Sequence, residues 1–198
     1  MAGLSEKALD LILEFEGLNQ PKNWPGGASG ITIGIGYDLG YVTVDQFESD
    51  WGEYLRANVR ERLKAVVGMH GTKAKNRAST LAGIRIRRDN AEEIFNERTI
   101  PLYEFKTSQA FPGYENLPGD VQGALVSLVY NRGTSMTDES PEDRRREMRD
   151  IREAVQRGDL KAIAEQLRSM KRLWVGKGLD GLLRRRDAEA DLVESAIA

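Results

Sequence analysis

The sequence predicts an α+β protein that is predominantly α-helical, with one small β-hairpin near its N-terminus. Residues 31–38 alternate apolar with small or polar side chains, which is the period of a β-strand. Most of the remaining chain carries apolar residues at helical spacing, between residues that start or stop helices. At 198 residues the chain is long enough for one domain, or two closely packed lobes, with a real core.

The first predicted helix begins at Ser5, whose side chain can cap it, and should end at Gly17. Its expected buried face follows the i, i+3, i+4, i+7 spacing and consists of Leu9, Ile12, Leu13 and Glu16. A carboxyl group at the end of an apolar face is a candidate general acid, because burial disfavours the ionised form. The alternative is a structural glutamate in a buried ion pair, for example with an arginine near the C-terminus.

The β-like segment is predicted to fold back on itself. In a straight strand Thr32 and Asp38 would lie roughly 20 Å apart, too far to share a substrate. A turn centred on Ile35, with Gly34 and Gly36 supplying unusual backbone angles, would pair Thr32 with Asp38 at about 5 Å between their Cβ atoms. The pair would flank a floor without side chains, wide enough for a sugar ring or a water molecule. The alternative is an ordinary hairpin with a Thr–Asp cross-strand pair.

The remaining elements are expected to be helices. Their starts are marked by capping residues or a first-turn proline at Thr43, Asp89, Ser140-Pro141 and Asp159. The first of these helices should run to about Val67, Pro101 should kink or end the second, and Gly158 should end the third. Residues 19–29 and 134–139 are expected to be loops.

The composition excludes several kinds of site and partner. The chain has no cysteine and one histidine, His70, which leaves no thiol nucleophile, no Ser–His–Asp triad and no metal cluster; we expect no cofactor. No apolar run approaches the roughly 20 residues of a membrane-spanning helix, so no membrane insertion is expected. A pI near 5.7 disfavours nucleic-acid binding. The first residues lack the pattern of a signal peptide, so we expect synthesis in the cytoplasm.

Four segments together resemble the phage-type lysozymes, muramidases of the T-even endolysin class. The first is Glu16-Gly17-Leu18 followed by Thr32-Ile33-Gly34-Ile35-Gly36, which is similar to the catalytic segment of that family. The other three are similar to its central buried helix, its following helix and its closing motif, and they are Ala124–Gly133, Gly158–Trp174 and Gly181–Glu189. The four segments occur in the same order as in the family and span nearly the whole chain.

One departure from the phage enzymes indicates a particular branch. Phage lysozymes place a second carboxylate nine residues after the glutamate, where this chain has Pro25. Here a carboxylate follows the glycines instead, in Tyr37-Asp38-Leu39-Gly40, which resembles the pesticin branch of bacteriocin muramidases.

The resemblance implies a lysozyme-like fold in a single catalytic domain, with the first helix and hairpin in a lobe of about residues 1–42 and a helical lobe of about 43–198. It implies a muramidase acting on peptidoglycan glycan strands, with Glu16, Thr32 and Asp38 as catalytic residues and Gly34, Gly36 and Tyr37 in substrate binding. It also places Arg185 or Arg186 near the catalytic glutamate.

A monomer is expected, acting on the wall in the periplasm after delivery by a holin, a phage tail or a secretion system. Two alternatives stay open: a non-catalytic wall-binding or tail-structural module, and a lytic transglycosylase or chitinase-like enzyme.

Overall fold

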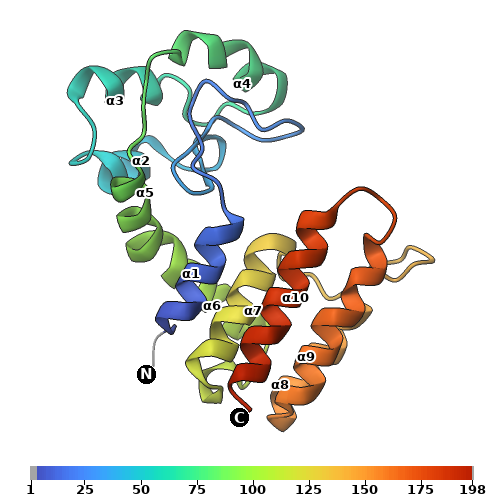
Figure 1. Ribbon diagram of the computed structural model, residues 1–198. Coiled ribbons are helices and arrows are strands. Elements are labelled where there is room, and N and C mark those ends of the chain that lie inside the picture. The colour runs from blue at the N-terminus through green and yellow to red at the C-terminus, as the bar shows by residue number, and fades with distance from the viewer. Residues whose placement is uncertain (1–3, 198) are drawn as a thin grey trace. The chain divides into compact units, whose positions relative to one another are not determined.

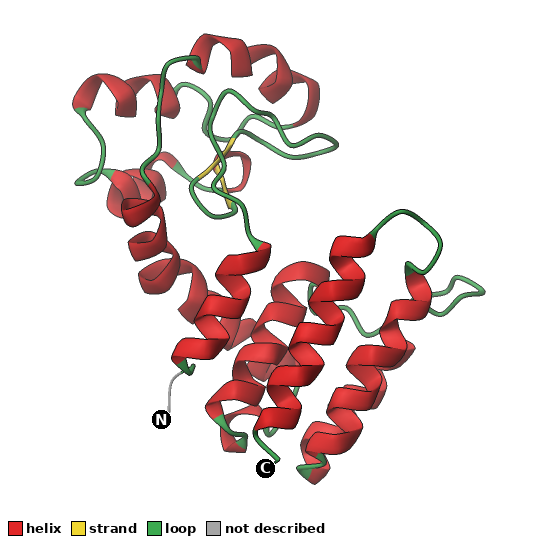
Figure 2. Cartoon of the chain, viewed as in Figure 1, coloured by secondary structure: helices red, strands yellow, loops and turns green. Residues whose placement is uncertain are grey.

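The computed structural model describes residues 4–197, and its backbone contacts divide the chain into two compact units (Figure 1). The first, here the helical unit, joins Met1–Phe15 to Pro101–Ala198. The second, the hairpin unit, is Glu16–Ile100. Helix and hairpin elements of the expected kinds are both present, and the α+β, predominantly α, fold class is confirmed (Figure 2). That the whole chain forms a single catalytic domain stays a prediction.

The helical unit is built around a helix that is buried on all sides. Residues Val121–Val129 of this helix, α7, are buried without interruption, as expected for a helix at the centre of a helical core. Helix α10 packs against α7 and α9, α8 packs against α9, and α1 packs against α7 (Figure 1). The helices of this unit are α1 (Glu6–Phe15), α6 (Ile100–Ala110), α7 (Gly119–Arg132), α8 (Arg146–Arg157), α9 (Leu160–Ser169) and α10 (Asp180–Ser195).

Helix α1 starts as predicted, and of its predicted buried face Ile12 is confirmed while Leu9 and Leu13 are not. The Ser5 hydroxyl accepts a hydrogen bond from the backbone N–H of Ala8 at 3.1 Å, so the predicted cap is confirmed. The residues buried in α1 are Ala8, Leu11 and Ile12, whereas the predicted Leu9 and Leu13 are only half-buried. The reason is the close approach to α7: a Cβ added at Gly123 would lie 2.0 Å from the Cβ of Ala8. The helix ends at Phe15, one residue before Glu16.

The hairpin unit carries a two-stranded antiparallel sheet followed by short helices (Figure 2). The strands are β1 (Thr32–Ile33) and β2 (Tyr37–Asp38). The helices are α2 (Val44–Trp51), α3 (Ala57–Lys64), α4 (Gly71–Ala78) and α5 (Arg88–Ile94), with a π-helical segment, η3, at Phe95–Thr99. The predicted interruption before Pro101 therefore takes the form of a π-helical segment, and α6 starts at Ile100.

Three predicted helix boundaries are wrong. The helix expected to be capped by Asp89 starts at Arg88, and no side chain among the described residues caps its N-terminus. The helix expected from Thr43 to about Val67 is two helices, because the chain turns after Trp51 and the Arg60 guanidinium fixes that turn by donating to the Gly52 carbonyl at 2.9 Å. The Thr43 cap itself is confirmed by a 3.1 Å hydrogen bond from the Gln46 backbone N–H to the Thr43 hydroxyl.

The helix expected from Ser140-Pro141 begins only at Arg146. The carboxylate of Asp138 accepts hydrogen bonds from the backbone N–H groups of Ser140 and Arg144, which holds this stretch in a turn. The predicted end of α8 and the predicted start of α9 are confirmed. Gly158 follows α8 with the left-handed φ of 65°, and Asp159 caps the start of α9 by accepting from the Ala162 backbone N–H at 3.0 Å. Within residues 4–197, no helix is both long enough and apolar enough to span a membrane.

Candidate active site

The hairpin has the predicted register. Thr32 lies opposite Asp38, and Ile33 lies opposite Tyr37. The turn between the strands is made by Gly34 and Gly36, whose φ values of 57° and 66° fall in the left-handed region that favours glycine. The apolar positions Ile31, Ile33 and Ile35 are buried at 0%, 0% and 2% exposure, but Thr32, at 7% exposure, and Gly34 are buried as well, so the first half of the hairpin is buried on both faces. The structure therefore brings the hydroxyl of Thr32 and the carboxylate of Asp38 to facing positions on neighbouring strands.

The Asp38 carboxylate is held by backbone donors. Its Oδ1 atom accepts hydrogen bonds from the N–H of Gly40 at 2.8 Å and of Gly30 at 3.0 Å, and Oδ2 lies 3.1 Å from the same Gly30 nitrogen. An ionised carboxylate offers about four acceptor positions, so capacity remains for another donor such as water. These bonds fix the orientation of the side chain and join the segment before β1 to the one after β2.

Two glycines make that arrangement possible. A Cβ at Gly30 would lie 2.4 Å from Asp38 Oδ1 and 2.4 Å from the Gly40 nitrogen, and a Cβ at Gly40 would lie 2.8 Å from His70 Nδ1. The backbone can approach the carboxylate this closely only where side chains are absent.

Glu16 follows directly after helix α1 and is half-buried. Three residues later, the backbone of Asn19 pairs with that of Gly34 at the hairpin turn, through hydrogen bonds of 2.7 and 3.1 Å. The Asn19 amide also donates to the carbonyls of Gly34 at 3.2 Å and of Gly17 at 3.3 Å. The chain that carries Glu16 is thus tied to the turn between Thr32 and Asp38. That the three side chains converge on one substrate remains a proposal.

Helix α2 contacts strand β2 and the turn of the hairpin through Asp50 and Trp51. The Tyr37 hydroxyl donates a 2.8 Å hydrogen bond to the Asp50 carboxylate, which is 4% exposed and also accepts from the Gln46 amide at 2.8 Å. Burial, followed by the Asp50 hydrogen bond and charge, raises the pKa of Tyr37 well above its usual range. A Cβ at Gly34 would lie 2.9 Å from the Trp51 ring. These contacts give Tyr37 and Gly34, which were predicted to bind substrate, a structural role in holding the hairpin.

Sequence reasoning did not identify Asn19, Gly30 or Asp50. Asn19 lies in a segment read only as a loop, and its partner Gly34 is 15 residues away, so no local pattern marks the pair. Asp50 lies four residues after Gln46 on one helix, and this spacing brings the two side chains together. Their hydrogen bond could therefore have been predicted from the sequence.

The closing motif places charged groups in the core of the helical unit. Glu189 and Arg186 are 0% exposed and Arg185 is 3% exposed. The Glu189 Oε1 atom accepts from the Ser127 hydroxyl at 2.6 Å and from Arg186 at 2.8 Å. Burial raises the pKa of Glu189, while the guanidinium groups and Ser127 oppose that shift by stabilising the carboxylate. The buried carboxylate joins α10 to α7, which explains why this motif contains ionisable residues at core positions.

No group of three or more histidine, cysteine, aspartate or glutamate side chains within residues 4–197 could hold a metal ion. Among known families, the model described as "Pesticin: Bacterial toxin homologue of phage lysozyme, C-term" matches residues 8–148. That range contains Glu16, both strands, and Asp38 with its backbone donors Gly30 and Gly40. No curated protein matches the sequence significantly.

Proposed function

Because the chain belongs to the pesticin family of phage-lysozyme homologues, we propose that it hydrolyses the β-1,4 bond between N-acetylmuramic acid and N-acetylglucosamine. Membership in this family suggests a lysozyme-type peptidoglycan hydrolase. The muramidase specificity and the residue roles below are our proposal. The observation that carries them is the register that sets Thr32 opposite Asp38 in a hairpin tied to the Glu16 segment through Asn19.

Glu16 is assigned as the general acid that protonates the leaving glycosidic oxygen. Its half-buried position after α1 suits a group that must exchange a proton with substrate and also be sheltered from bulk water. Glu14, in the last turn of α1, is exposed, so these two glutamates differ in surroundings although they are two residues apart.

Asp38 and Thr32 are assigned to the attacking water. The Asp38 carboxylate is oriented by the Gly30 and Gly40 backbone, and a fixed acceptor can hold a water molecule in one position. The Thr32 hydroxyl, on the facing strand, can donate or accept a second hydrogen bond to the same water. In the turn beside them Gly36 is exposed, whereas Gly34 packs against the Trp51 ring.

The test is zymography on purified peptidoglycan with wild type, Glu16→Gln and Glu14→Gln. Both substitutions remove one carboxylate from the same helix end, so their charge change is identical. We expect Glu16→Gln to reduce clearing by at least about a hundredfold, as for loss of a general acid, and Glu14→Gln to clear like wild type. Binding to wall without clearing by wild type would instead indicate a non-catalytic module.

Mass spectrometry of the products tests the reaction type. Hydrolysis leaves reducing ends on the muropeptides, whereas lytic transglycosylation leaves anhydromuramyl ends. Anhydromuramyl products, or release of sugars from chitin alone, would contradict the assignment as a muramidase. We expect reducing muramic acid ends.

A further inference from the structure

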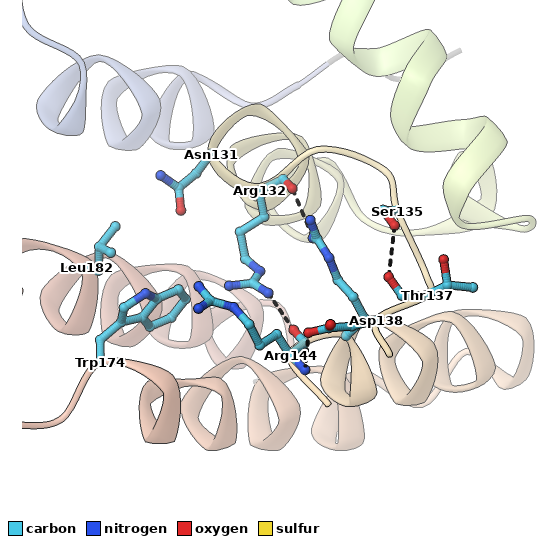
Figure 3. Close-up of a pocket in the computed structure, with 9 residues that line it drawn as sticks. Asn131, Arg132, Ser135, Thr137, Asp138, Arg144, Trp174 and Leu182 are labelled. Carbon is cyan, nitrogen blue, oxygen red and sulfur yellow. Dashed lines mark hydrogen bonds between the residues drawn. The ribbon is translucent and has the colours of Figure 1, made fainter. Parts of the chain in front are cut away.

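A pocket of about 500 Å³ lies in the helical unit, where helix α7 ends (Figure 3). Three arginines line it, Arg132, Arg144 and Arg145, together with Asp138 and Trp174. Its volume is within the range of small-molecule sites. None of these residues has a part in the proposed hydrolysis of the wall.

The wall of this pocket carries excess positive charge. Within residues 4–197, none of the three arginines forms an ion pair with a carboxylate: Arg132 donates to the Arg144 carbonyl at 2.5 Å, and Arg145 donates to the Arg132 carbonyl at 2.9 Å. Asp138 is the acidic residue of the lining, and hydrogen bonds from the Ser140 and Arg144 backbone N–H groups lower its pKa. Three guanidinium groups and one carboxylate leave the lining with a net charge of +2.

Arg132 is held in a position that disfavours its charge. Its guanidinium gains a cation–π contact, 5.0 Å from the centre of the Trp174 ring, but its buried Nε atom has no hydrogen-bond partner within the part of the protein that the structure describes. Burial, followed by the charges of Arg145, Arg186 and Arg144, lowers the pKa of Arg132 to about 10. Grouping partly buried like charges costs free energy that a bound anion would recover.

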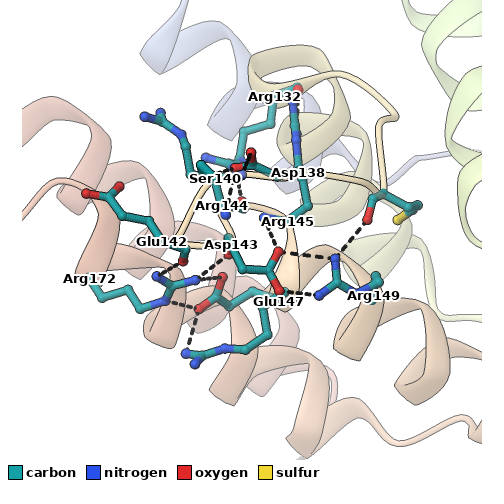
Figure 4. Close-up of polar contacts among 12 residues, drawn as sticks. Arg132, Asp138, Ser140, Glu142, Asp143, Arg144, Arg145, Glu147, Arg149 and Arg172 are labelled. Carbon is teal, nitrogen blue, oxygen red and sulfur yellow. Dashed lines mark hydrogen bonds and ion pairs between the residues drawn. The ribbon is translucent and has the colours of Figure 1, made fainter.

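The loop between α7 and α8, which carries Arg144 and Arg145, is held by two other arginines that do have carboxylate partners (Figure 4). Arg172 pairs with the fully buried Glu147 at 2.6 Å and donates to the carbonyls of Glu142 and Asp143. Arg149 pairs with Asp143 and donates to the Met136 carbonyl at 2.9 Å. These contacts fix the backbone of the loop that carries Arg144 and Arg145, next to Arg132 at the end of α7.

We propose that this pocket binds a phosphate group, as inorganic phosphate or as the phosphate of a small monoester. A phosphate monoester carries close to two negative charges at neutral pH, which matches the charge of the lining, whereas a single carboxylate would neutralise only half of it. Guanidinium groups bind phosphate oxygens with paired, planar hydrogen bonds. The hydroxyls of Ser135 and Thr137 also line the pocket, and the volume left beside a phosphate can hold an attached group of about the size of a sugar.

Calorimetric titration with inorganic phosphate and with glucose 1-phosphate, at low ionic strength and neutral pH, tests the site directly. The informative variant is Arg144→Gln, because that side chain is exposed and makes no hydrogen bond or ion pair within residues 4–197, so its loss should leave the fold intact. The matched control is Arg152→Gln on helix α8, also exposed, which changes the net charge equally. We expect each ligand to bind the Arg152 variant as tightly as it binds wild type. Each should bind the Arg144 variant about tenfold more weakly.

Acetate provides the comparison of anion class and should bind wild type at least about tenfold more weakly than phosphate. No binding of phosphate to wild type would overturn the proposal, as would an equal loss of affinity in both variants. Equal affinity for acetate would overturn the choice of phosphate. Because the titration contains no cell wall, its outcome is independent of the proposed muramidase activity.

Discussion

The carboxylate of Asp38 and the backbone N–H of Gly30 are joined by a hydrogen bond that divides between the two oxygens, at 3.0 and 3.1 Å. A group assigned to the attacking water therefore also holds together the two segments that flank the hairpin. A substitution that removes the whole side chain would disturb both roles at once. The catalytic and the structural role can be separated by two kinds of substitution. One removes the negative charge of Asp38 but keeps its acceptor oxygen, and the other keeps the carboxylate but obstructs its backbone partner.

Asp38→Asn is such a change. The amide oxygen can stay at the Oδ1 position and accept from both Gly30 and Gly40, while the negative charge and the longer bond from Gly30 to Oδ2 are lost. We expect clearing of peptidoglycan to fall by about a hundredfold, because the water loses its charged acceptor. The free energy of unfolding should fall by about 1 kcal/mol or less. Turbidity assays and urea denaturation of the same preparation measure both, and full activity in this variant would remove Asp38 from the mechanism.

Gly30→Ala tests the opposite case, in which the carboxylate is kept and its backbone partner is obstructed. The added Cβ would lie 2.4 Å from both Asp38 Oδ1 and the Gly40 nitrogen. We expect a loss of about 2 to 3 kcal/mol in the free energy of unfolding, as for overpacking at a site that cannot relax, together with lower activity. Gly17→Ala is the control, since a Cβ there has no neighbour within 4 Å. Equal stability of the two variants would show that the Gly30 contact is not restrictive.

The strongest sequence prediction was the hairpin, because its determinants are local. Period-two alternation and two glycines around Ile35 were enough to give both the register of Thr32 with Asp38 and the left-handed turn. The helix caps at Ser5, Thr43 and Asp159 were predictable for the same reason: donor and acceptor are three residues apart.

The features that were missed depend on partners far away in sequence. The buried face of α1 is set by the contact of Ala8 with Gly123, and propensity within the first helix contains no information about that contact. The start of α8 is delayed because Asp138 holds a turn that Ser140-Pro141 alone would not specify. The basic pocket was missed because only the folded loop brings Arg132 close to Arg144.

Glu147 should set part of the acid stability of the protein. Burial raises its pKa, but the hydrogen bond and charge of Arg172 outweigh that effect, so the pKa in the folded state lies below its ordinary value of 4.5. The folded state therefore binds its proton less readily than the unfolded state. The resulting stabilisation is present above about pH 4.5 and is lost as the pH falls through the lower folded value.

Glu147→Gln should remove this contribution and leave Arg172 without its buried partner. We expect a loss of about 3 kcal/mol at pH 7, and a smaller difference from wild type as the pH falls below 4.5. Urea denaturation at several pH values between 3 and 7 measures it. Glu153→Gln on the exposed face of α8 is the control, because its 3.9 Å pair with Arg157 is solvated and should contribute little. A constant difference across the pH range would contradict the assignment to Glu147.

The stereochemistry of hydrolysis follows from how Asp38 acts. Acting through a water molecule, as proposed, it would deliver the nucleophile to the face opposite the leaving group and invert the anomeric configuration, which requires carboxyl groups about 6.5 to 9.5 Å apart. The hydrogen bonds to Gly30 and Gly40 hold this carboxylate back against the loop, an arrangement that suits an acceptor of water better than a nucleophile that must reach the sugar. Proton NMR during the first minutes of digestion should therefore show the α-anomer of the new muramic acid reducing end before mutarotation. Initial release of the β-anomer would mean retention, with a carboxyl separation of about 5 Å and a glycosyl-enzyme intermediate, and would exclude the water-mediated role of Asp38.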